Sequence, residues 1–362
     1  MSLIRLDITD FRNLGVIKLE PIANGFNFFF GHNGSGKTSL LEAVYYLSRG
    51  RSFRSLNAAH IVRNSAEKFS IFAQVQTQHV SLTKSVGIER KRRGEARVRV
   101  DGADIPTVSE LVEITPTLLI NSNCHNLLDS GPVFRRKYLD WGSFYANKDF
   151  LPIWKTYQRA LRQRNAVLRK RLSKKEVDLW TGELIQSGLL LDQLRREFVQ
   201  QLLSFLTSLI GELLTLPGLS ISYFPGWDEA CSYQDALFHS FDKDWAFGYT
   251  QLGPHRADFK VIINGSPAKD ILSRGQQKLF VCAMMVAQGA LLQRCVNRKP
   301  IYLIDDLPSE LDVVSRAKLM ALLSRQEAQV FLTAVDREAL VDTFGDAPLK
   351  MFHVEHGNAV EA

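Results

Sequence analysis

The octapeptide from Gly31 to Thr38 constrains the fold of this chain more than any other segment, because it matches the pattern G-x-x-x-x-G-K-[ST]. Its glycines allow successive backbone N–H groups to turn inward around phosphate oxygens, provided that a strand enters the loop and a helix leaves it. The apolar run Phe28 to Phe30 precedes the loop, and Leu40 and Val44 follow it at helical spacing. A chance glycine turn before a helix is the much weaker alternative in this context. The segment predicts an α/β fold that binds nucleotide phosphates.

Each residue of this loop has a predicted part in binding. Lys37 is expected to reach the β and γ phosphates, and the hydroxyl of Thr38 to ligate Mg²⁺. The helix that follows directs its positive N-terminal end at the anion. The predicted cofactors are ATP and Mg²⁺, and the predicted binding residues are Gly31, His32, Asn33, Gly34, Ser35, Gly36, Lys37 and Thr38.

A second element is the apolar run Ile301 to Ile304, which ends in Asp305 and Asp306. Such a strand buries its body and presents carboxylates at its C-terminal end, where the ligands of an α/β sheet gather. Asp305 is predicted to complete the Mg²⁺ site, and Asp306 to orient or deprotonate the attacking water. Acids at a strand end are by themselves more often helix caps or solvated groups. Beside a phosphate loop, they favour ATP hydrolysis with Lys37 and Asp306 as catalytic residues.

A third element, Leu272-Ser273-Arg274-Gly275-Gln276-Gln277, stands just before an apolar helix. It resembles the signature of ABC-type ATPases, Leu-Ser-Gly-Gly-Gln, with Arg274 in place of the first glycine. In that family the segment belongs to the opposite subunit's site, so the resemblance implies that Ser273, Gly275 and Gln276 contact nucleotide across a dimer interface. A serine N-cap with a glycine turn describes the same residues. Both interpretations hold together, because a free helix N-terminus is also an anion site.

Two further segments separate classes within that family. Ser309 to Asp312 resembles its D-loop, which lies along the dimer interface. Thr333 ends the next predicted strand, where members of the transporter type carry a switch histidine and DNA-repair members often do not. The nucleotide-binding subunit of a membrane transporter therefore remains only an alternative.

Several landmarks in order along the chain resemble the RecF family of bacterial recombination mediators, which is SMC-like and ABC-type. They are Gly34 to Ala43, Ser52 to Ser55, Arg135 to Gly142, Gly253 to Asp258 and Leu272 to Lys278. The resemblance implies an ATP-dependent homodimer that binds DNA at single-strand gaps and acts with RecO and RecR. It also implies a role in loading RecA during gap repair, replication and the SOS response. A DNA-binding module that holds ATP without hydrolysing it is a further alternative, because Asp306 stands where strong ATPases have glutamate.

Two basic clusters suggest where DNA would bind. One lies between Arg159 and Lys175, with no acid until Glu176, and the other at a predicted hairpin tip from Arg90 to Arg93. Each is by itself as consistent with a solvated face as with phosphate binding, but together they favour a DNA backbone contact whose affinity falls with salt. No base-reading motif is present. The candidates are Arg159, Arg162, Arg169, Lys170, Arg92 and Arg93.

The predicted fold is α/β: an ABC-type ATPase head with a mixed sheet, an antiparallel β region over residues 68–105 and a helical second lobe. The predicted domains are 1–132, the first half of the head; 133–215, the helical lobe; and 216–362, the second half. Strands are expected near 247–250, 259–263 and 330–333, and helices from about Gly275 and Val314.

The overall composition of the chain bears on its partners, its redox state and its location. The formal charge of +7 favours a polyanionic partner without establishing one. The four cysteines, scattered at positions 124, 231, 282 and 295, suggest neither a disulfide framework nor a zinc site. The N-terminal segment reads as a strand and the longest apolar stretch is short, so we expect no export signal, no membrane segment and a cytoplasmic location.

Some polar residues keep open roles. Asn121 and Asn123 stand where the family has a proline and an acid, and solvated loop residues are the simpler interpretation. Arg135 and Arg136 fit nucleotide, DNA or internal ion-pair roles, and His255 and Arg256 fit structural or interface roles.

Overall fold

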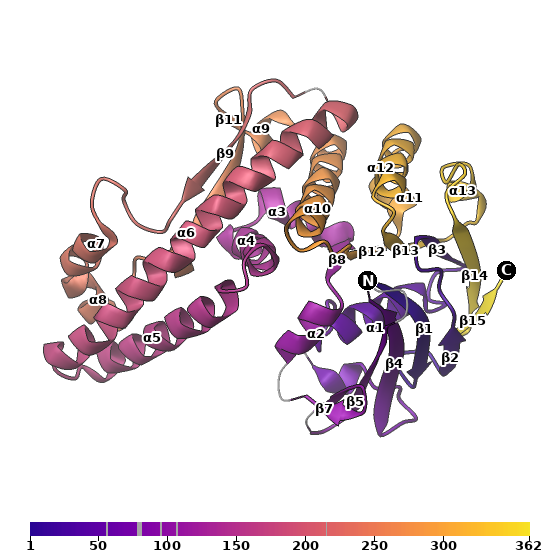
Figure 1. Cartoon of the computed structure of the whole chain (residues 1–362), viewed down its shortest axis with the longest axis horizontal. Helices are drawn as coiled ribbons and strands as arrows, with labels where there is room; N and C mark the ends of the chain where they lie inside the picture. Colours follow the sequence, from indigo (N-terminus) through magenta and orange to yellow (C-terminus); the bar gives the residue numbers. More distant parts are fainter. Residues whose placement is uncertain (56, 78–81, 95, 106–107, 215) are drawn as a thin grey trace. The chain divides into compact units, whose positions relative to one another are not determined.

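The computed structural model describes residues 1–55, 57–77, 82–94, 96–105, 108–214 and 216–362 (Figure 1). The chain divides into two compact units. The sheet unit comprises Met1–Cys124 and Lys278–Ala362, and the helical unit comprises His125–Gln277. The two ends of the sequence therefore build one unit, and its middle builds the other.

The sheet unit contains an antiparallel sheet with the strand order β2-β1-β4-β5-β6-β7. Its strands bury alternate side chains, as a sheet with one covered face requires. This confirms the antiparallel region expected over residues 68–105 and adds the N-terminal strands to it. The strands are β1 (Ser2–Thr9), β2 (Val16–Leu19), β4 (Lys68–Gln76), β5 (Thr83–Lys91), β6 (Ala96–Val100) and β7 (Ala103–Asp104).

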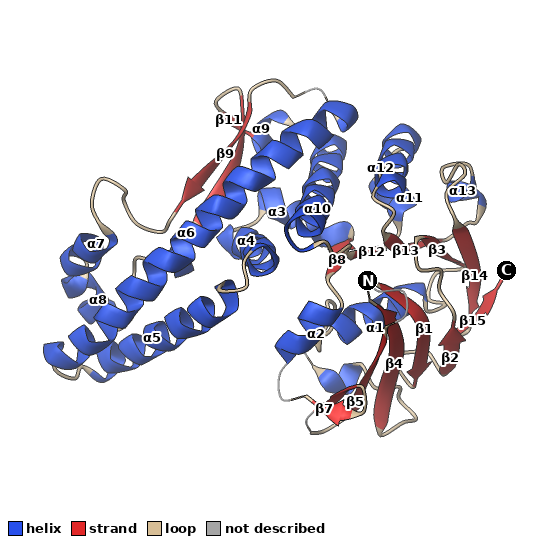
Figure 2. Ribbon diagram, viewed as in Figure 1, coloured by secondary structure: helices blue, strands red, loops and turns tan. Residues whose placement is uncertain are grey.

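The second sheet of this unit has the order β15-β14-β3-β13-β12-β8, in which all neighbours are parallel except β14 and β15 (Figure 2). β12 is buried at every position, which is typical of a parallel strand covered on both faces. The carboxyl ends of β3, β12 and β13 meet at one edge, where ligands of such sheets bind. The strands are β3 (Gly25–Phe30), β8 (Thr117–Ile120), β12 (Ile301–Ile304), β13 (Gln329–Ala334), β14 (Leu349–Glu355) and β15 (Asn358–Glu361).

One hydrophobic core joins both sheets through helix α1 (Lys37–Arg49). Leu40, Leu41 and Leu47 of α1 pack in the same cluster as residues of β1, β4, β12 and β13. The phosphate loop thus opens onto a helix that is fixed on two sides. The other helical segments of the unit are η1 (Ala58–His60), α2 (Val108–Ile114), α11 (Leu307–Glu310), α12 (Val313–Arg325) and α13 (Glu338–Val341).

The helical unit is dominated by two long antiparallel helices, α5 (Phe150–Lys170) and α6 (Lys174–Leu213). A short turn joins them: Arg171 takes a left-handed conformation, and Ser173 caps α6 in a capping box with Glu176. The core contains Tyr157 and Tyr233. The remaining elements are η2 (Ser122–His125), which crosses into this unit, α3 (Asn126–Asp129), α4 (Pro132–Ala146), β9 (Leu219–Phe224), α7 (Tyr233–His239), α8 (Phe241–Phe247), η3 (Pro254–Arg256), β10 (Asp258–Ile263), β11 (Ser266–Pro267) and α9 (Ala268–Ile271).

Two expectations about this middle region differ from the structure. The strand expected near 247–250 is wrong, because α8 ends at Phe247 and Gly248 closes it in a left-handed conformation. The small sheet β11-β10-β9 falls in the helical unit, because β9 packs against α6 and β10 against α4. The helical unit thus comprises residues 125–277, whereas the change in composition along the sequence had suggested a helical lobe over residues 133–215.

Helix α10 (Arg274–Val296) begins in the helical unit and continues in the sheet unit. By length and composition it could cross a membrane, but 67% of its most apolar window is buried inside the structure. Such burial is typical of a core helix. Within the described residues it is the one helix of this kind.

Candidate nucleotide-binding site

The phosphate loop links the end of β3 to the start of α1, and three of its glycines have positive φ: Gly31 (148°), Gly34 (81°) and Gly36 (124°). L-amino acids with side chains rarely adopt these angles. At Gly31 a Cβ atom would also run into the carbonyl oxygen of Val354. The glycines are therefore required by the backbone path, and this path points the start of α1 at the cavity.

Lys37 is buried at the centre of the loop, where its Nζ donates to the carbonyl oxygens of Gly31 at 2.5 Å and His32 at 2.9 Å. Burial lowers the pKa of Lys37, and the negative charges of Asp306, Asp305 and Asp336 oppose that effect. The ammonium group is thus held in place beside several carboxylates before a phosphate arrives. Asp336, which follows β13, was not predicted from the sequence.

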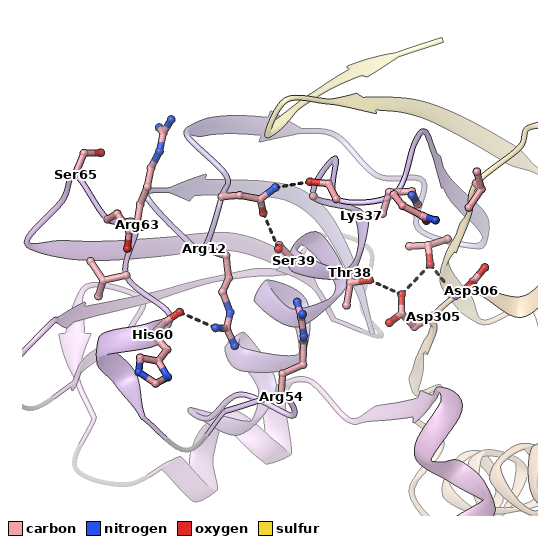
Figure 3. A pocket seen from close by; sticks show the side chains of 18 residues that line it. Arg12, Lys37, Thr38, Ser39, Arg54, His60, Arg63, Ser65, Asp305 and Asp306 are labelled. Carbon is pink, nitrogen blue, oxygen red and sulfur yellow. Dashed lines mark hydrogen bonds between the residues drawn. The ribbon is translucent and has the colours of Figure 1, made fainter. Parts of the chain in front are cut away.

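Asp305 receives hydrogen bonds from two hydroxyls that come from distant parts of the sequence (Figure 3). Thr38 Oγ1 donates to its Oδ1 at 3.0 Å, and Thr333 Oγ1 donates to the same atom at 2.9 Å. Burial raises the pKa of Asp305, and these two bonds oppose the rise. Hydroxyl and carboxylate oxygens are the ligands that Mg²⁺ prefers in proteins, usually alongside waters and substrate phosphates. The side chains of Thr38 and Asp305 therefore fit a Mg²⁺ ion.

Asp306 has a left-handed backbone, with φ 52° and ψ 53°. Its N–H donates to Thr333 Oγ1 at 2.8 Å, which ties the strained residue to the neighbouring strand. Aspartate tolerates this conformation better than most residues, and such strain clusters at functional sites. Thr333 thus contacts both acids. The sequence had marked this position only as the one where transporters have a histidine, so this role was not predicted.

These residues line a cavity of about 790 Å³, which the phosphate loop, β12 and β13 share with the turn after β1 and the segment 60–65. Asn13 fastens that turn to the phosphate loop, because its Nδ2 donates to the Gly34 carbonyl at 3.1 Å and its Oδ1 accepts from Ser39 at 2.8 Å. Further lining residues had no role predicted from the sequence: Arg12, Asn13, Ser39, Arg54, His60, Val62, Arg63, Asn64, Ser65 and Val335.

Glu42 organises two of these arginines from inside α1. Its side chain is 0% exposed, and it pairs with Arg12 at 2.7 Å and with Arg54 at 3.8 Å. Ser52 Oγ donates to Glu42 at 2.5 Å and accepts the N–H groups of Arg54 and Ser55. A charged residue inside the apolar run of α1 was the one sequence feature that could have indicated this network. The segment Ser52 to Ser55 had been noted only for its resemblance to the family.

Arg92 supports another wall of the cavity. Its guanidinium donates to the backbone carbonyls of five residues, 59, 62, 63, 64 and 66. The prediction placed Arg92 at a hairpin tip facing DNA. The hairpin of β5 and β6 is present, but this side chain turns inward to hold the segment that lines the cavity.

The signature segment lies in the helical unit, at the start of α10. Ser273 N–H donates to Gln276 Oε1 at 3.0 Å, and Gln276 N–H donates to Ser273 Oγ at 3.3 Å. This reciprocal pair is a capping interaction. Ser273, Gly275 and Gln276 are exposed, so the capped helix end remains accessible to a ligand.

The residues with open roles take part in internal contacts. Asn121 and Cys124 form a local turn, in which the Asn121 N–H lies 3.1 Å from Cys124 Sγ and its Oδ1 accepts from the Asn123 N–H. Arg135 pairs with Asp258 through two bonds of 2.6 and 3.0 Å.

Arg136 donates to the Ala257 carbonyl at 2.9 Å. His255 Nδ1 lies 2.7 Å from the Tyr157 hydroxyl, and burial lowers the pKa of His255 to about 4. The Arg256 guanidinium lies 5.8 Å from the centre of the Tyr249 ring. Arg136 and His255 thus have internal contacts, whereas Arg256 is exposed.

The candidate DNA residues of α5 are all exposed. Arg162, Arg169 and Lys170 are exposed, and Arg159 is exposed but paired with Glu183 at 2.5 Å. Arg164, a member of the same charge run, is buried and pairs with Asp244 at 2.7 Å. On the hairpin, Arg93 is exposed.

Comparison with known proteins identifies the family. Residues 2–359 match the family model described as the RecF/RecN/SMC N terminal domain. The proteins named "DNA replication and repair protein RecF" from Shewanella pealeana and Shewanella piezotolerans are 40% and 41% identical over 357 residues, which is 99% of this chain and 98% of theirs.

Solved structures give the same result. The recombination mediator protein RecF of the RecFOR pathway, in an ATP form, superposes with a TM-score of 0.87 at 26% identity, covering 100% of this chain and 97% of that one. An Smc head superposes with a TM-score of 0.59 at 12% identity, covering 100% of this chain and 98% of that one, a likeness of fold alone. The comparisons exclude the transporter alternative and confirm the predicted α/β head. The chain belongs to the RecF family of DNA replication and repair proteins, which have an ATP-binding head.

Proposed function

We propose that this protein is an ATP-dependent recombination mediator that binds DNA at single-strand gaps, dimerises on ATP and hydrolyses it slowly. The observation that carries this proposal is the convergence of Thr38, Asp305 and Thr333 beside the phosphate loop, although Thr38 and Asp305 are 267 residues apart in the sequence. This arrangement supports the proposal of a site for ATP, and for chemistry at its γ-phosphate, within the sheet unit.

The proposed hydrolysis relies on positioning and on charge. Lys37, already held by two carbonyl oxygens, would neutralise charge on the γ-phosphate. Thr38 and Asp305 would hold Mg²⁺, which when bound supplies further positive charge to the phosphates. Asp306 would orient or deprotonate the attacking water, from a backbone position that Thr333 fixes.

The proposed dimer rests on the exposed signature segment. Ser273, Gly275 and Gln276 lie at the N-terminal end of a 23-residue helix, where backbone N–H groups and the helix dipole favour an anion. We propose that this helix end meets the γ-phosphate bound by a second copy of the chain. ATP would then act as a timer: binding joins two copies, and hydrolysis separates them.

The proposed partners follow from the family. Structures of relatives are described as belonging to the RecFOR pathway, so RecO and RecR are the proposed protein partners in loading RecA, in the cytoplasm. The formal charge of +7 and the exposed cations of α5 support DNA as a partner through its phosphates.

Sedimentation velocity with and without ATP and magnesium tests the dimer. Wild type is expected to dimerise only with both, and Ser273→Arg to remain monomeric at equal ATP occupancy. Ser204→Arg places the same charge on an exposed position of α6 and serves as the control. This part of the proposal is refuted if wild type forms no dimer with ATP and magnesium, or if Ser273→Arg dimerises to the same extent as wild type.

Phosphate release in the presence of DNA tests hydrolysis. Asp306→Asn is expected to slow release by about 100-fold or more, since general-base catalysis typically contributes that much. Asp342→Asn, an exposed position of the same unit, should behave as wild type. Equal and negligible rates in wild type and Asp306→Asn would favour instead a DNA-binding module that holds ATP without hydrolysing it.

A further inference from the structure

Two large aromatic rings of the helical unit are exposed to solvent. Phe238, at the end of α7, is 70% exposed, and Phe247, the last residue of α8, is 65% exposed. Tyr249, two residues further along, is 40% exposed and its ring centre lies 6.2 Å from that of Phe247. A single exposed apolar residue needs no explanation, but a local group of aromatic rings indicates a binding surface.

These rings lie beside the turn that joins α5 to α6, here called the basic turn (residues 169–175). The ammonium of Lys174 lies 5.8 Å from the centre of the Phe238 ring. The backbone of Gly248 lies against Arg169, since a Cβ atom built on this glycine would be 3.2 Å from Arg169 Cγ. Figure 1 shows α7 and α8 at the same end of the helical unit as this turn.

The basic turn carries a net positive charge that its surroundings do not cancel. The acids that follow it at the start of α6, Glu176 and Asp178, are fewer than its five cations, and Glu176 caps the helix. No ion pair involves the cations of the turn within the described part of the chain. These exposed cations are Arg169, Lys170, Arg171, Lys174 and Lys175.

Buried contacts join the end of α5, which carries Arg169 and Lys170, to the segment around α8, which carries Phe247. Arg164 of α5 and Asp244 of α8 form an ion pair whose side chains are 1% and 0% exposed. Asn165 of α5 accepts the N–H and hydroxyl of Thr250, at 2.8 and 2.7 Å. The end of α5 and the segment around α8 therefore form one rigid surface, ready to meet an extended ligand.

We infer that this surface binds single-stranded DNA, with phosphates against the basic turn and unpaired bases stacked on Phe238 and Phe247. Aromatic rings beside a basic track are the combination by which proteins hold single strands without sequence preference. A duplex offers phosphates to the cations, but its base faces are already stacked and closed to the rings. The inference rests on the proposed DNA-binding function and specifies which strand is held and where.

Fluorescence anisotropy with a labelled oligothymidylate and a duplex of equal length tests the inference, using the full chain with ATP. Phe238→Leu combined with Phe247→Leu keeps apolar side chains but removes the stacking faces. It is expected to weaken single-strand binding by about fivefold or more for each ring, and to leave duplex binding within twofold. Phe238→Trp combined with Phe247→Trp is expected to restore single-strand affinity, and Phe224→Leu on β9 is the matched aromatic control.

The salt dependence separates the two kinds of contact. Lys170→Gln combined with Lys174→Gln is expected to reduce the slope of log affinity against log salt by about 1.4, or roughly 0.7 for each phosphate contact on a single strand. The leucine variant should keep the wild-type slope. Wild-type circular dichroism and an unchanged urea unfolding transition in both variants show that the helical unit is intact.

Three outcomes would overturn the inference. If wild type binds DNA and the leucine variant binds oligothymidylate equally well, the rings hold no bases, and the proposed function still stands. If single-strand and duplex binding fall equally, the surface does not distinguish unpaired bases. If wild type binds neither DNA, the proposed function fails together with this inference.

Discussion

In the candidate nucleotide pocket of the sheet unit, Lys37 is buried, Asp305 is half-buried, and each has defined hydrogen-bond partners. At the basic turn of the helical unit, Lys170 and Lys174 extend into solvent. The buried polar groups of the pocket are held in one geometry, whereas the exposed cations of the turn form no ion pair among the described residues. Buried, preorganised groups suit recognition of one small anion, and exposed cations suit a long and variable polyanion. The following predictions test this contrast.

The largest expected effect concerns Arg164, the one member of the charge run between Arg159 and Lys175 that is buried with its partner. Arg164→Leu would leave Asp244 buried without a counter-charge, at a cost of about 3–5 kcal/mol in the free energy of unfolding. Arg169→Leu, on the same helix but exposed, should change it by less than about 0.5 kcal/mol. Urea unfolding of the full chain measures both. Similar effects of the two variants would erase the distinction between structural and surface cations.

Removal of Lys37 should have the next largest effect. Lys37→Ala is expected to weaken ATP binding by about 100-fold, the equivalent of about 2.7 kcal/mol, because a charge-assisted bond to phosphate is lost. Lys175→Ala should leave ATP affinity unchanged and weaken DNA binding instead. Isothermal titration calorimetry with ATP decides the first part. A loss of ATP affinity in Lys175→Ala would contradict the separation of the two regions.

The pH dependence of stability should show the buried state of His255. Its pKa in the folded protein is about 4, against an ordinary value of 6.5, because burial disfavours the charged form. Between these values the unfolded chain binds more protons, so stability rises with pH across the window and is lost as pH falls. Between pH 7 and pH 5 the loss from this group is about 2 kcal/mol. In urea unfolding, His255→Gln should make the free energy of unfolding less dependent on pH between pH 5 and pH 7. A pH dependence identical to that of wild type would contradict the lowered pKa of His255.

The smallest expected effect concerns the cap that shapes the basic turn. Ser173→Ala removes the side chain of the capping box and should lower the free energy of unfolding by about 1 kcal/mol. Ser204→Ala, at an exposed position in the middle of the same helix, is the matched control and should lie within about 0.5 kcal/mol of wild type. An equal effect of the two would show that the turn does not depend on its cap.

The sequence predicted the pocket better than the surfaces around it, for physical reasons. The phosphate loop has few backbone solutions, so its glycines and Lys37 identified it directly, and the buried strand before Asp305 placed that acid at a sheet edge. Asn13, Glu42 and Arg92 could not be found in this way, because their partners are backbone carbonyls and side chains brought together only by the fold. Likewise, a run of arginines does not reveal which member, such as Arg164, turns inward.

Arg92 has a consequence for how ATP affinity depends on distant positions. The segment that it holds through five carbonyl groups forms part of the cavity wall, although Arg92 itself is not among the lining residues. Without that guanidinium the segment would sample many conformations, and ATP would have to select the binding one at a cost in chain entropy. The β5–β6 hairpin therefore lowers the entropic cost of nucleotide binding before the nucleotide arrives. Substitutions in this hairpin would change the affinity for ATP without changing any residue that contacts it.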